Sequence, residues 1–294
     1  MIRLLFSLLA LVCFSATPSA QPLDLRYDLK EGQEYRFKQV ETTTALAQAN
    51  DGRGTSIDRR ITRYFTITVE KSGIEEISYL FVQDTAIVSE NSEDASMQGQ
   101  HIDVQNVLTK KRIRVRQSSS GKLLSVTAVD PLGVQQRFGP GVSDAMFTQR
   151  AALLPALPAR PVEPGMVWQD SHRDTLYPSK EVPGAGRGSG LRLTANATEY
   201  TIKDFDERKG YRCLAVSWTG NSELEEKIVF DTLEEFTEDA STVSGELFVA
   251  TDSGLPVFLD VTTEQENTRA VFGQHNNVVP SSIRTHLTLE LFSQ

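Results

Sequence analysis

Cysteine is scarce in this sequence, which has two among its 294 residues. Cys13 lies in an apolar leader, so Cys213 is the one cysteine of the remaining chain. A fold held together by intramolecular disulfides is therefore excluded. The neighbours of Cys213 are apolar and aromatic, which predicts a buried strand position where the thiol acts as a small hydrophobe rather than as a nucleophile.

Long apolar runs are also lacking beyond the first twenty residues. Arg3 is followed by an apolar run over residues 4–14 and by small residues up to Ala20, and this pattern predicts a secretory signal peptide over residues 1–20. Cys13 suggests a lipoprotein, but Val12 before it is not the small residue expected there. No later stretch approaches the roughly 18 apolar residues of a membrane-spanning helix. We therefore expect an exported protein, periplasmic or extracellular, with no transmembrane span.

Basic residues are outnumbered by acidic ones. Without the leader, 29 Lys and Arg stand against 39 Asp and Glu, a formal charge of −10. Nucleic acid is therefore excluded as a partner, because neutralising its phosphates requires a basic surface.

A short motif near the middle of the chain repeats one near its start. Residues 27–35 and 160–168 share an apolar residue, a turn glycine and an aromatic residue at a constant offset of 133: Leu29 and Val162, Gly32 and Gly165, Tyr35 and Trp168. A glycine turn followed by an aromatic residue is suited to begin a strand and anchor it in a core. We therefore expect the rings of Tyr35 and Trp168 to be buried, each in its own half of the protein.

Strand patterns recur on both sides of a Pro-rich connector. Residues 63–70 alternate apolar and polar side chains, as do the last strand-like residues, 283–291. We expect a mainly β protein of two similar curved antiparallel sheets, half-barrel or sandwich-like. Its divisions are a first β half over residues 21–130, a connector over 131–160 with a helix at 143–154 capped by Ser143, and a second β half over 161–294. Arg114 and Arg116 fall on apolar Leu247 and Val249, so this repeat requires a bulge or a shifted register.

No catalytic or metal-ligating constellation emerges. Asp170, His172 and Asp174 would share one strand face, but three such donors spread over about 13 Å fit a polar outer face better than one metal site. The other histidines are interpreted as surface or loop residues: His101, His275 and His286. We predict no catalytic residues, no metal and no cofactor, and the sequence identifies no ligand-binding residue.

The glycine-rich residues 183–190 are expected to form a flexible loop. They lead into a strand rather than a helix, so they are not a phosphate cradle. Ser189 stands between glycines but not in the pattern of a hydrolase nucleophile.

Three arginines alternate along the strand predicted from Val107 to Gln117: Arg112, Arg114 and Arg116. Contact with an anionic surface is one interpretation. The favoured one is a solvated strand face paired with acidic residues, for which the acidic run over residues 223–239 is the expected counterpart.

These motifs support one family comparison. The Leu29–Gly32–Tyr35 opening, the Ser120–Gly121–Lys122 turn and the Val162–Gly165–Trp168 restart resemble a family of exported bacterial proteins and lipoproteins known only as a domain of unknown function. The resemblance implies a β-rich fold and no assigned activity. A more distant likeness, to periplasmic lipoprotein carriers, implies curved sheets around an apolar ligand.

Three functional hypotheses remain open. The leading one is an exported, non-enzymatic β-protein that binds a lipid or another amphipathic ligand in a sheet concavity. The second is a structural or interaction module whose partner is an envelope protein. The third is a hydrolase whose site is assembled from scattered residues that the sequence does not reveal.

Overall fold

The computed structural model describes residues 22–48, 54–92, 105–138, 144–158, 160–182, 186–273 and 276–293. The leader, Ser143, His101 and His275 lie outside these ranges, so what was predicted for them stays a prediction. The strands before the connector are β1 (Glu34–Gln48), β2 (Gly54–Ser72), β3 (Glu76–Ser92), β4 (Arg112–Ser118) and β5 (Leu123–Ala128). Those after it are β6 (Val167–Leu176), β7 (Ser179–Val182), β8 (Gly186–Arg208), β9 (Tyr211–Val229), β10 (Glu234–Ala250), β11 (Pro256–Phe272) and β12 (Asn277–Ser293).

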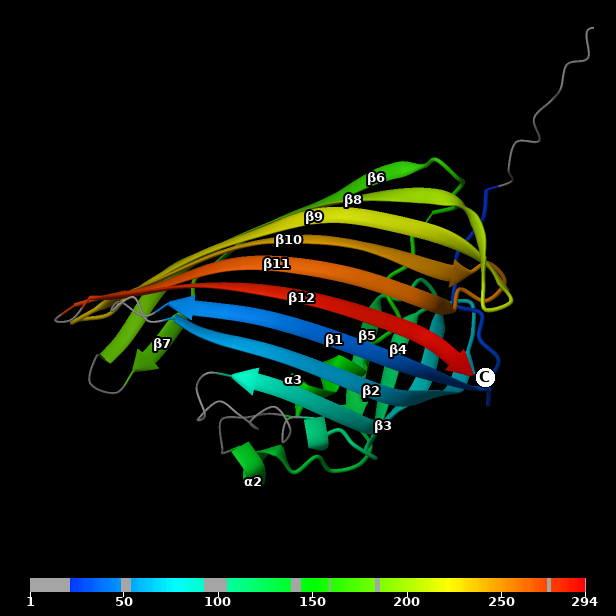
Figure 1. The fold of residues 1–294 in the computed structure, drawn as a ribbon, viewed down its shortest axis with the longest axis horizontal. Helices are drawn as coiled ribbons and strands as arrows, with labels where there is room; N and C mark the ends of the chain where they lie inside the picture. Colours follow the sequence, from blue (N-terminus) through cyan, green and yellow to red (C-terminus); the bar gives the residue numbers. More distant parts are fainter. Residues whose placement is uncertain are drawn as a thin grey trace, which may run out of the picture.

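All twelve strands belong to one curved antiparallel sheet, drawn as an arch in Figure 1. The strand order is β5-β4-β3-β2-β1-β12-β11-β10-β9-β8-β6, with β7 paired to β8. The predicted mainly β, curved half-barrel architecture is confirmed. The two expected sheets are, however, joined edge to edge, because β12 pairs with β1 on one side and with β11 on the other.

The alternation in β2 shows why these residues form strands. Phe65, Ile67 and Val69 are buried on one face of β2, whereas the intervening residues are more exposed on the other. Because successive strand residues point to opposite faces, this pattern places one face of the sheet on a core.

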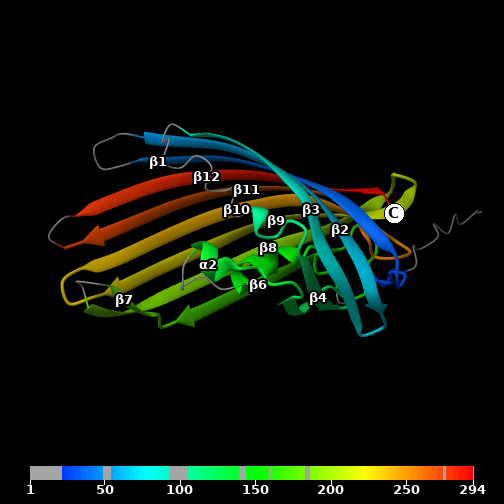
Figure 2. The same ribbon diagram turned by 90° about the horizontal axis from the view of Figure 1, so that it is seen from below.

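The core lies on the concave face, at the end of the sheet where β1 begins. This part of the sheet is covered by the short helix α2 (Val134–Phe138) and by residues 144–158, which include the short helix α3 (Ala145–Thr148). Figure 2 shows this covering from below. Leu154 and Leu157 from the covering segment are buried against the core, as are Leu25 and Tyr27 from the N-terminal segment. The Tyr27 hydroxyl donates a hydrogen bond to the Pro155 carbonyl (2.7 Å).

The segments that lead into β1 and β6 each bind to a turn far away in the sequence. The amide of Leu157, before β6, donates to the carbonyl of Ser120 in the turn between β4 and β5 (2.7 Å). The amide of Asp28, before β1, donates to the carbonyl of Ser253 in the turn between β10 and β11 (2.9 Å). The strands before and after the connector are therefore tied together by these segments.

The two turns that suggested a repeat have the same local structure. Gly32 donates to the Val69 carbonyl (2.8 Å), and Gly165 donates to the Ile202 carbonyl (2.9 Å), again 133 residues apart. Both glycines have positive φ, 77° and 84°, which a residue with a β-carbon rarely adopts. The sheet also shifts register near Arg116 in β4 and near Val249 in β10. The division of the chain into duplicated halves stays a prediction.

Three local predictions are corrected. The helix expected over residues 143–154 is a single turn, α3, followed by the 3₁₀ turn η1 (Gln149–Ala151), and the Asp144 side chain makes no capping hydrogen bond. The strand expected from Val107 begins at Arg112. Residues 186–190, expected to form a loop, begin β8, because their glycines allow close packing: a β-carbon at Gly188 would lie 2.6 Å from the Phe230 ring.

Among the described residues, no helix is long and apolar enough to span a membrane.

Candidate functional site

One line of side chains crosses the sheet on its concave face, and we call it the cross-sheet row. Directly paired residues of neighbouring antiparallel strands point to the same face. Following these pairs from β6 to β2, the row consists of Trp168, Tyr200, Trp218, Gly245, Val261, Leu287, Glu41 and Ile61. It therefore connects the two parts of the chain on either side of the connector.

The row begins with three aromatic side chains on adjacent strands. Trp168 and Tyr200 stack with ring centroids 4.9 Å apart and planes 10° from parallel. With Trp218 and the Pro-rich residues 155–158 they line a pocket of about 350 Å³, which we call the aromatic pocket. Burial raises the pKa of Tyr200, and the Asp170 carboxylate at the pocket's rim raises it further. The aromatic rings and the prolines make this pocket largely apolar, and Asp170 adds a carboxylate to its lining.

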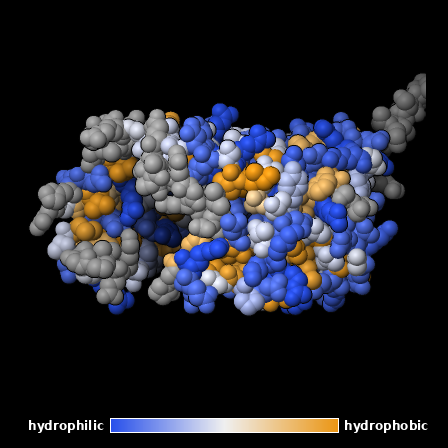
Figure 3. All heavy atoms as spheres, turned by 60° about the horizontal axis from the view of Figure 1, so that its bottom comes forward, coloured by the Kyte–Doolittle hydropathy of each residue, from blue (hydrophilic) through white to orange (hydrophobic). Residues whose placement is uncertain are grey.

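The middle of the row is a boundary between core and solvent. On the core side the neighbouring row is buried, with Leu247 and Leu289 at 5% and 3% exposure. Val261 and Leu287 in the cross-sheet row are partly exposed. Beyond them the concave face carries hydroxyl and amide side chains: Thr263, Thr285, Ser222, Ser241 and Gln265. Figure 3 shows a hollow with hydrophilic surface next to the covered part of the sheet.

The row ends in a second pocket, of about 340 Å³, which we call the arginine pocket. Its charged lining residues are Arg59, Arg63, Arg150 and Glu41. Arg63 donates from Nη1 to Glu41 (2.9 Å) and to Gln39 (3.1 Å). The walls are apolar and are formed by Ile61, Phe65, Phe81, Leu108 and Leu153.

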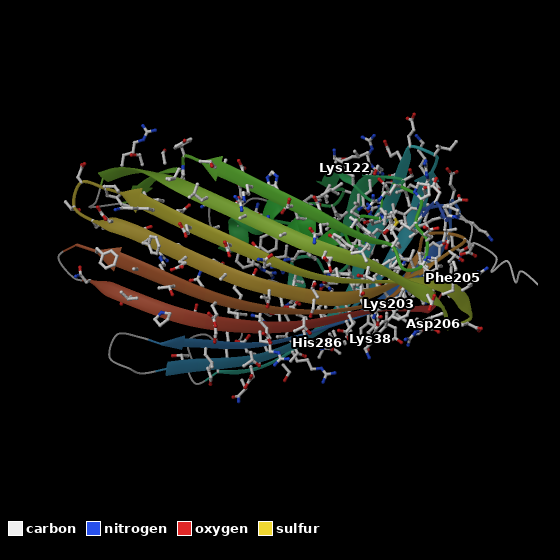
Figure 4. The ribbon with its side chains drawn as sticks, turned by 90° about the horizontal axis from the view of Figure 1, so that it is seen from above. Lys38, Lys122, Lys203, Phe205, Asp206 and His286 are labelled. Carbon is white, nitrogen blue, oxygen red and sulfur yellow. The ribbon has the colours of Figure 1, made fainter. Side chains whose placement is uncertain are left out.

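The convex face carries paired charges. Lys203 contacts Glu246 (2.7 Å), and His286 contacts Asp260 (3.1 Å). Figure 4 looks onto this face from above and labels Lys38, Lys203 and His286 there. His286 is thus on the surface, as predicted, and its partner is a carboxylate.

The structure separates the two predicted anchors. Tyr35 is 4% exposed, so its predicted burial is confirmed. Trp168 is only partly buried and lines the aromatic pocket. The prediction that its ring inserts into the core is therefore confirmed only in part, because the ring packs against the core from an edge strand and stays partly exposed.

The other candidates from the sequence lie apart from one another. Asp170, His172 and Asp174 are exposed along β6, but they share the face of Trp168, so they lie on the concave side and not on an outer face as expected. Arg112, Arg114 and Arg116 each form a two-pronged ion pair, as the favoured interpretation predicted, but with Asp130, Glu70 and Glu76 rather than with residues 223–239. Within the described ranges, no group of three His, Cys, Asp or Glu side chains converges as a metal site would require.

Sequence reasoning missed most of the cross-sheet row. Tyr200, Trp218 and Glu41 come from three strands, and only the register of the sheet brings them onto one line. One signal was available: the chain has two tryptophans, and both are in the row.

No family model matches the chain, and no curated protein matches it. Among solved structures it is similar to Neisserial surface protein A (6% identity, covering 88% of this chain and 99% of that one, TM-score 0.21). It is also similar to OpdQ of Pseudomonas aeruginosa (5%, 88% and 99%, 0.26) and to the hypothetical lipoprotein YmcC of Escherichia coli (9%, 83% and 85%, 0.20). At TM-scores this low the likenesses carry no argument about fold or function. The family resemblance drawn from the turn motifs stays a prediction.

Proposed function

We propose that this chain is an exported, non-enzymatic β-protein that binds an amphipathic ligand along the concave face of its sheet. The observation that carries the proposal is the cross-sheet row, where partly exposed apolar side chains lie between a buried core and a hydrophilic hollow. Export, to the periplasm or beyond the cell, rests on the leader over residues 1–20.

The geometry suits a molecule with an apolar and a polar part. Small-molecule sites are concave, mostly apolar and fitted with a few polar groups that fix orientation. Covering apolar surface is favourable by roughly 25 cal/mol per Å². A ligand lying along the row would cover Val261, Leu287 and the aromatic rings while its polar part faces the hydroxyl-bearing hollow.

Tryptophan emission tests this proposal directly, because both tryptophans are in the row. We expect dodecanol, added below its aggregation limit, to shift the emission to shorter wavelength in a saturable way. Leu287→Asn should weaken this response, because it places an amide in the row. Thr288→Asn, on the opposite face of β12, is the matched control and should bind as the wild type does.

Native mass spectrometry of gently extracted protein provides an independent measurement. A bound amphiphile of defined mass would support the proposal. A protein free of amphiphile, together with an emission spectrum that no added amphiphile shifts in a saturable way, would overturn it.

One observation favours a second candidate function, protein interaction within the envelope. β6 is an edge strand of the sheet, and its ten residues are exposed apart from partly buried Trp168. Edge strands present unpaired backbone groups that can add a strand from a partner. Cross-linking from Arg173→Cys would capture such a partner, whereas amphiphile binding without cross-links would favour the first candidate.

A further inference from the structure

We propose that the ligand of the cross-sheet row carries an anionic head group, a carboxylate or a phosphate ester, and that the arginine pocket binds it. This inference rests on the proposed function, since it names the chemical class of the ligand for the same site. It goes further in assigning the polar end of that ligand to Arg63 and Arg150.

Positive charge is concentrated in this pocket. Arg59 and Arg63 project from the same face of β2, with side chains only 17% and 12% exposed. Arg150 faces them from η1, and Glu41 is the one carboxylate among the described residues of the lining. Glu90, directly across from Arg59 in the β2–β3 ladder, adds a second carboxylate close by. Among the described groups at this pocket, three guanidinium groups stand against two carboxylates, so their sum is positive although the whole chain is acidic.

Arg63 is held in place largely by neutral groups. Its Nε donates to the Gln105 side chain (2.8 Å), and its Nη1 contacts the Gln39 amide oxygen as well as Glu41. Gln105 is 3% exposed, so this amide is part of the fold rather than a solvated contact. Amide oxygens accept hydrogen bonds without cancelling charge, so the guanidinium is positioned and still attracts an anion.

Arg150 lines the arginine pocket and is exposed to solvent. It forms no hydrogen bond or ion pair with any residue that the structure describes. Partial burial lowers the pKa of Arg150, and the like charges of Arg63 and Arg59 lower it further, against the opposing effect of Glu41. An anion between Arg63 and Arg150 would relieve this repulsion and accept hydrogen bonds from both.

The two pockets are close enough for one ligand to occupy both. Leu153 lines the arginine pocket and Pro155 lines the aromatic pocket, so about 7 Å of backbone separates the two linings. Along the row, Trp218 on β9 is four strand spacings from Glu41 on β1, roughly 19 Å. One lipid chain spans half the hydrocarbon thickness of a bilayer, roughly 15 Å. A single-chain amphiphile with its head group at the arginines would therefore cover most of the row and end about one strand spacing short of Trp218.

The test compares three amphiphiles of equal chain length by tryptophan emission: dodecanoate, dodecyl phosphate and dodecanol. We expect the two anions to bind the wild-type protein about tenfold more tightly than the alcohol. Arg150→Gln should remove most of this preference by weakening the binding of both anions. Arg137→Gln, an exposed arginine on α2 outside both pockets, is the matched control and should leave all three affinities unchanged.

A second variant tests the same inference independently if Arg150→Gln folds poorly. Glu41→Gln removes the carboxylate that competes for Arg63, so we expect tighter binding of both anions. General destabilisation would not produce that increase. In the wild-type protein, the two anions are compared with each other: the head group is a phosphate ester if dodecyl phosphate binds more tightly than dodecanoate, and a carboxylate if dodecanoate binds more tightly.

Failure of this inference is distinguishable from failure of the proposed function. Equal affinity of the three probes, in the wild type and in Arg150→Gln, would overturn the anionic head group and leave amphiphile binding standing. A lack of saturable response to all three would overturn the proposed function itself.

Discussion

The indole of Trp218 packs directly against the backbone of Gly245, its partner across the β9–β10 ladder. A β-carbon at Gly245 would come within 2.4 Å of Trp218 Cζ2. Glycine inside a strand is unfavourable by roughly 0.5–1 kcal/mol relative to alanine. Here it leaves room for the ring to extend over the next strand and continue the cross-sheet row.

Gly245→Ala should therefore displace the Trp218 ring. We expect a changed tryptophan emission spectrum, weaker amphiphile binding and a loss of roughly 1–3 kcal/mol of unfolding free energy from overpacking. Ser244→Ala, its neighbour on the convex face, is the control. Unchanged emission in Gly245→Ala would show that this contact does not position the ring.

The two anchoring aromatic residues should differ in what they contribute. Tyr35 is 4% exposed, so Tyr35→Ala is expected to lower the unfolding free energy by about 3–5 kcal/mol. Trp168 is partly buried on an edge strand, so Trp168→Ala should be clearly less destabilising while weakening amphiphile binding. Thermal melts and emission titrations measure both effects. A larger loss of unfolding free energy for Trp168→Ala than for Tyr35→Ala would show that Trp168 mainly stabilises the fold.

Acid should weaken the arginine ladder on the convex face. Arg112 donates to both Asp130 carboxylate oxygens (3.0 and 2.8 Å), and these bonds lower the Asp130 pKa from 3.8 to about 2. A carboxylate whose pKa is lower in the folded state stabilises the fold above its unfolded pKa, and that stability is lost as the pH falls. The loss should occur between about pH 4 and pH 2.

Asp130→Asn should therefore make unfolding in urea less dependent on pH over that window. Arg112→Gln removes the same pair, so the double variant should lose no more stability than either single variant. Additive losses would show that the two side chains do not stabilise the fold as a pair.

The thiol of Cys213 should be unreactive in the folded protein. Burial raises its pKa to about 11, so very little thiolate is present at neutral pH. We expect a chromogenic disulfide reagent to label Cys213 slowly at pH 8 and rapidly once urea unfolds the chain. Rapid labelling of the native protein would mean that the strand opens locally.

Side-chain alternation predicted the strands well, because one buried face leaves a period of two in the sequence. Phe65, Ile67 and Val69 are an example, and all three are buried. It could not predict how the strands join, since β12 is amphipathic in the same way whether it borders one neighbour or two. The glycines of β8 led to the prediction of a loop for a related reason. They allow close packing against Phe230 and Ile228, which are distant in sequence.

The candidate site was predictable only in part. The aromatic Trp168 stood out because it follows a turn glycine, but its burial depends on how far the connector reaches over the sheet. Arg63 and Arg150 are separated by a long stretch of chain, and no spacing rule relates a residue on a strand to one on a 3₁₀ turn. The ladder of Arg112, Arg114 and Arg116 was predicted to be paired, but register decided which carboxylates pair with it.

The position of β12 between β1 and β11 also governs how the protein can fold. The first strand finds one of its two partners only when the last strand has been made, so the fold has a high contact order, and folding should be slow. Until then β1 and β11 each present an open ladder to other chains, which is a risk of aggregation during folding. A chain that lacks β12 would have two separate sheets and two additional exposed edges, so proteolytic loss of the C-terminal strand should disrupt the whole molecule rather than one end of it.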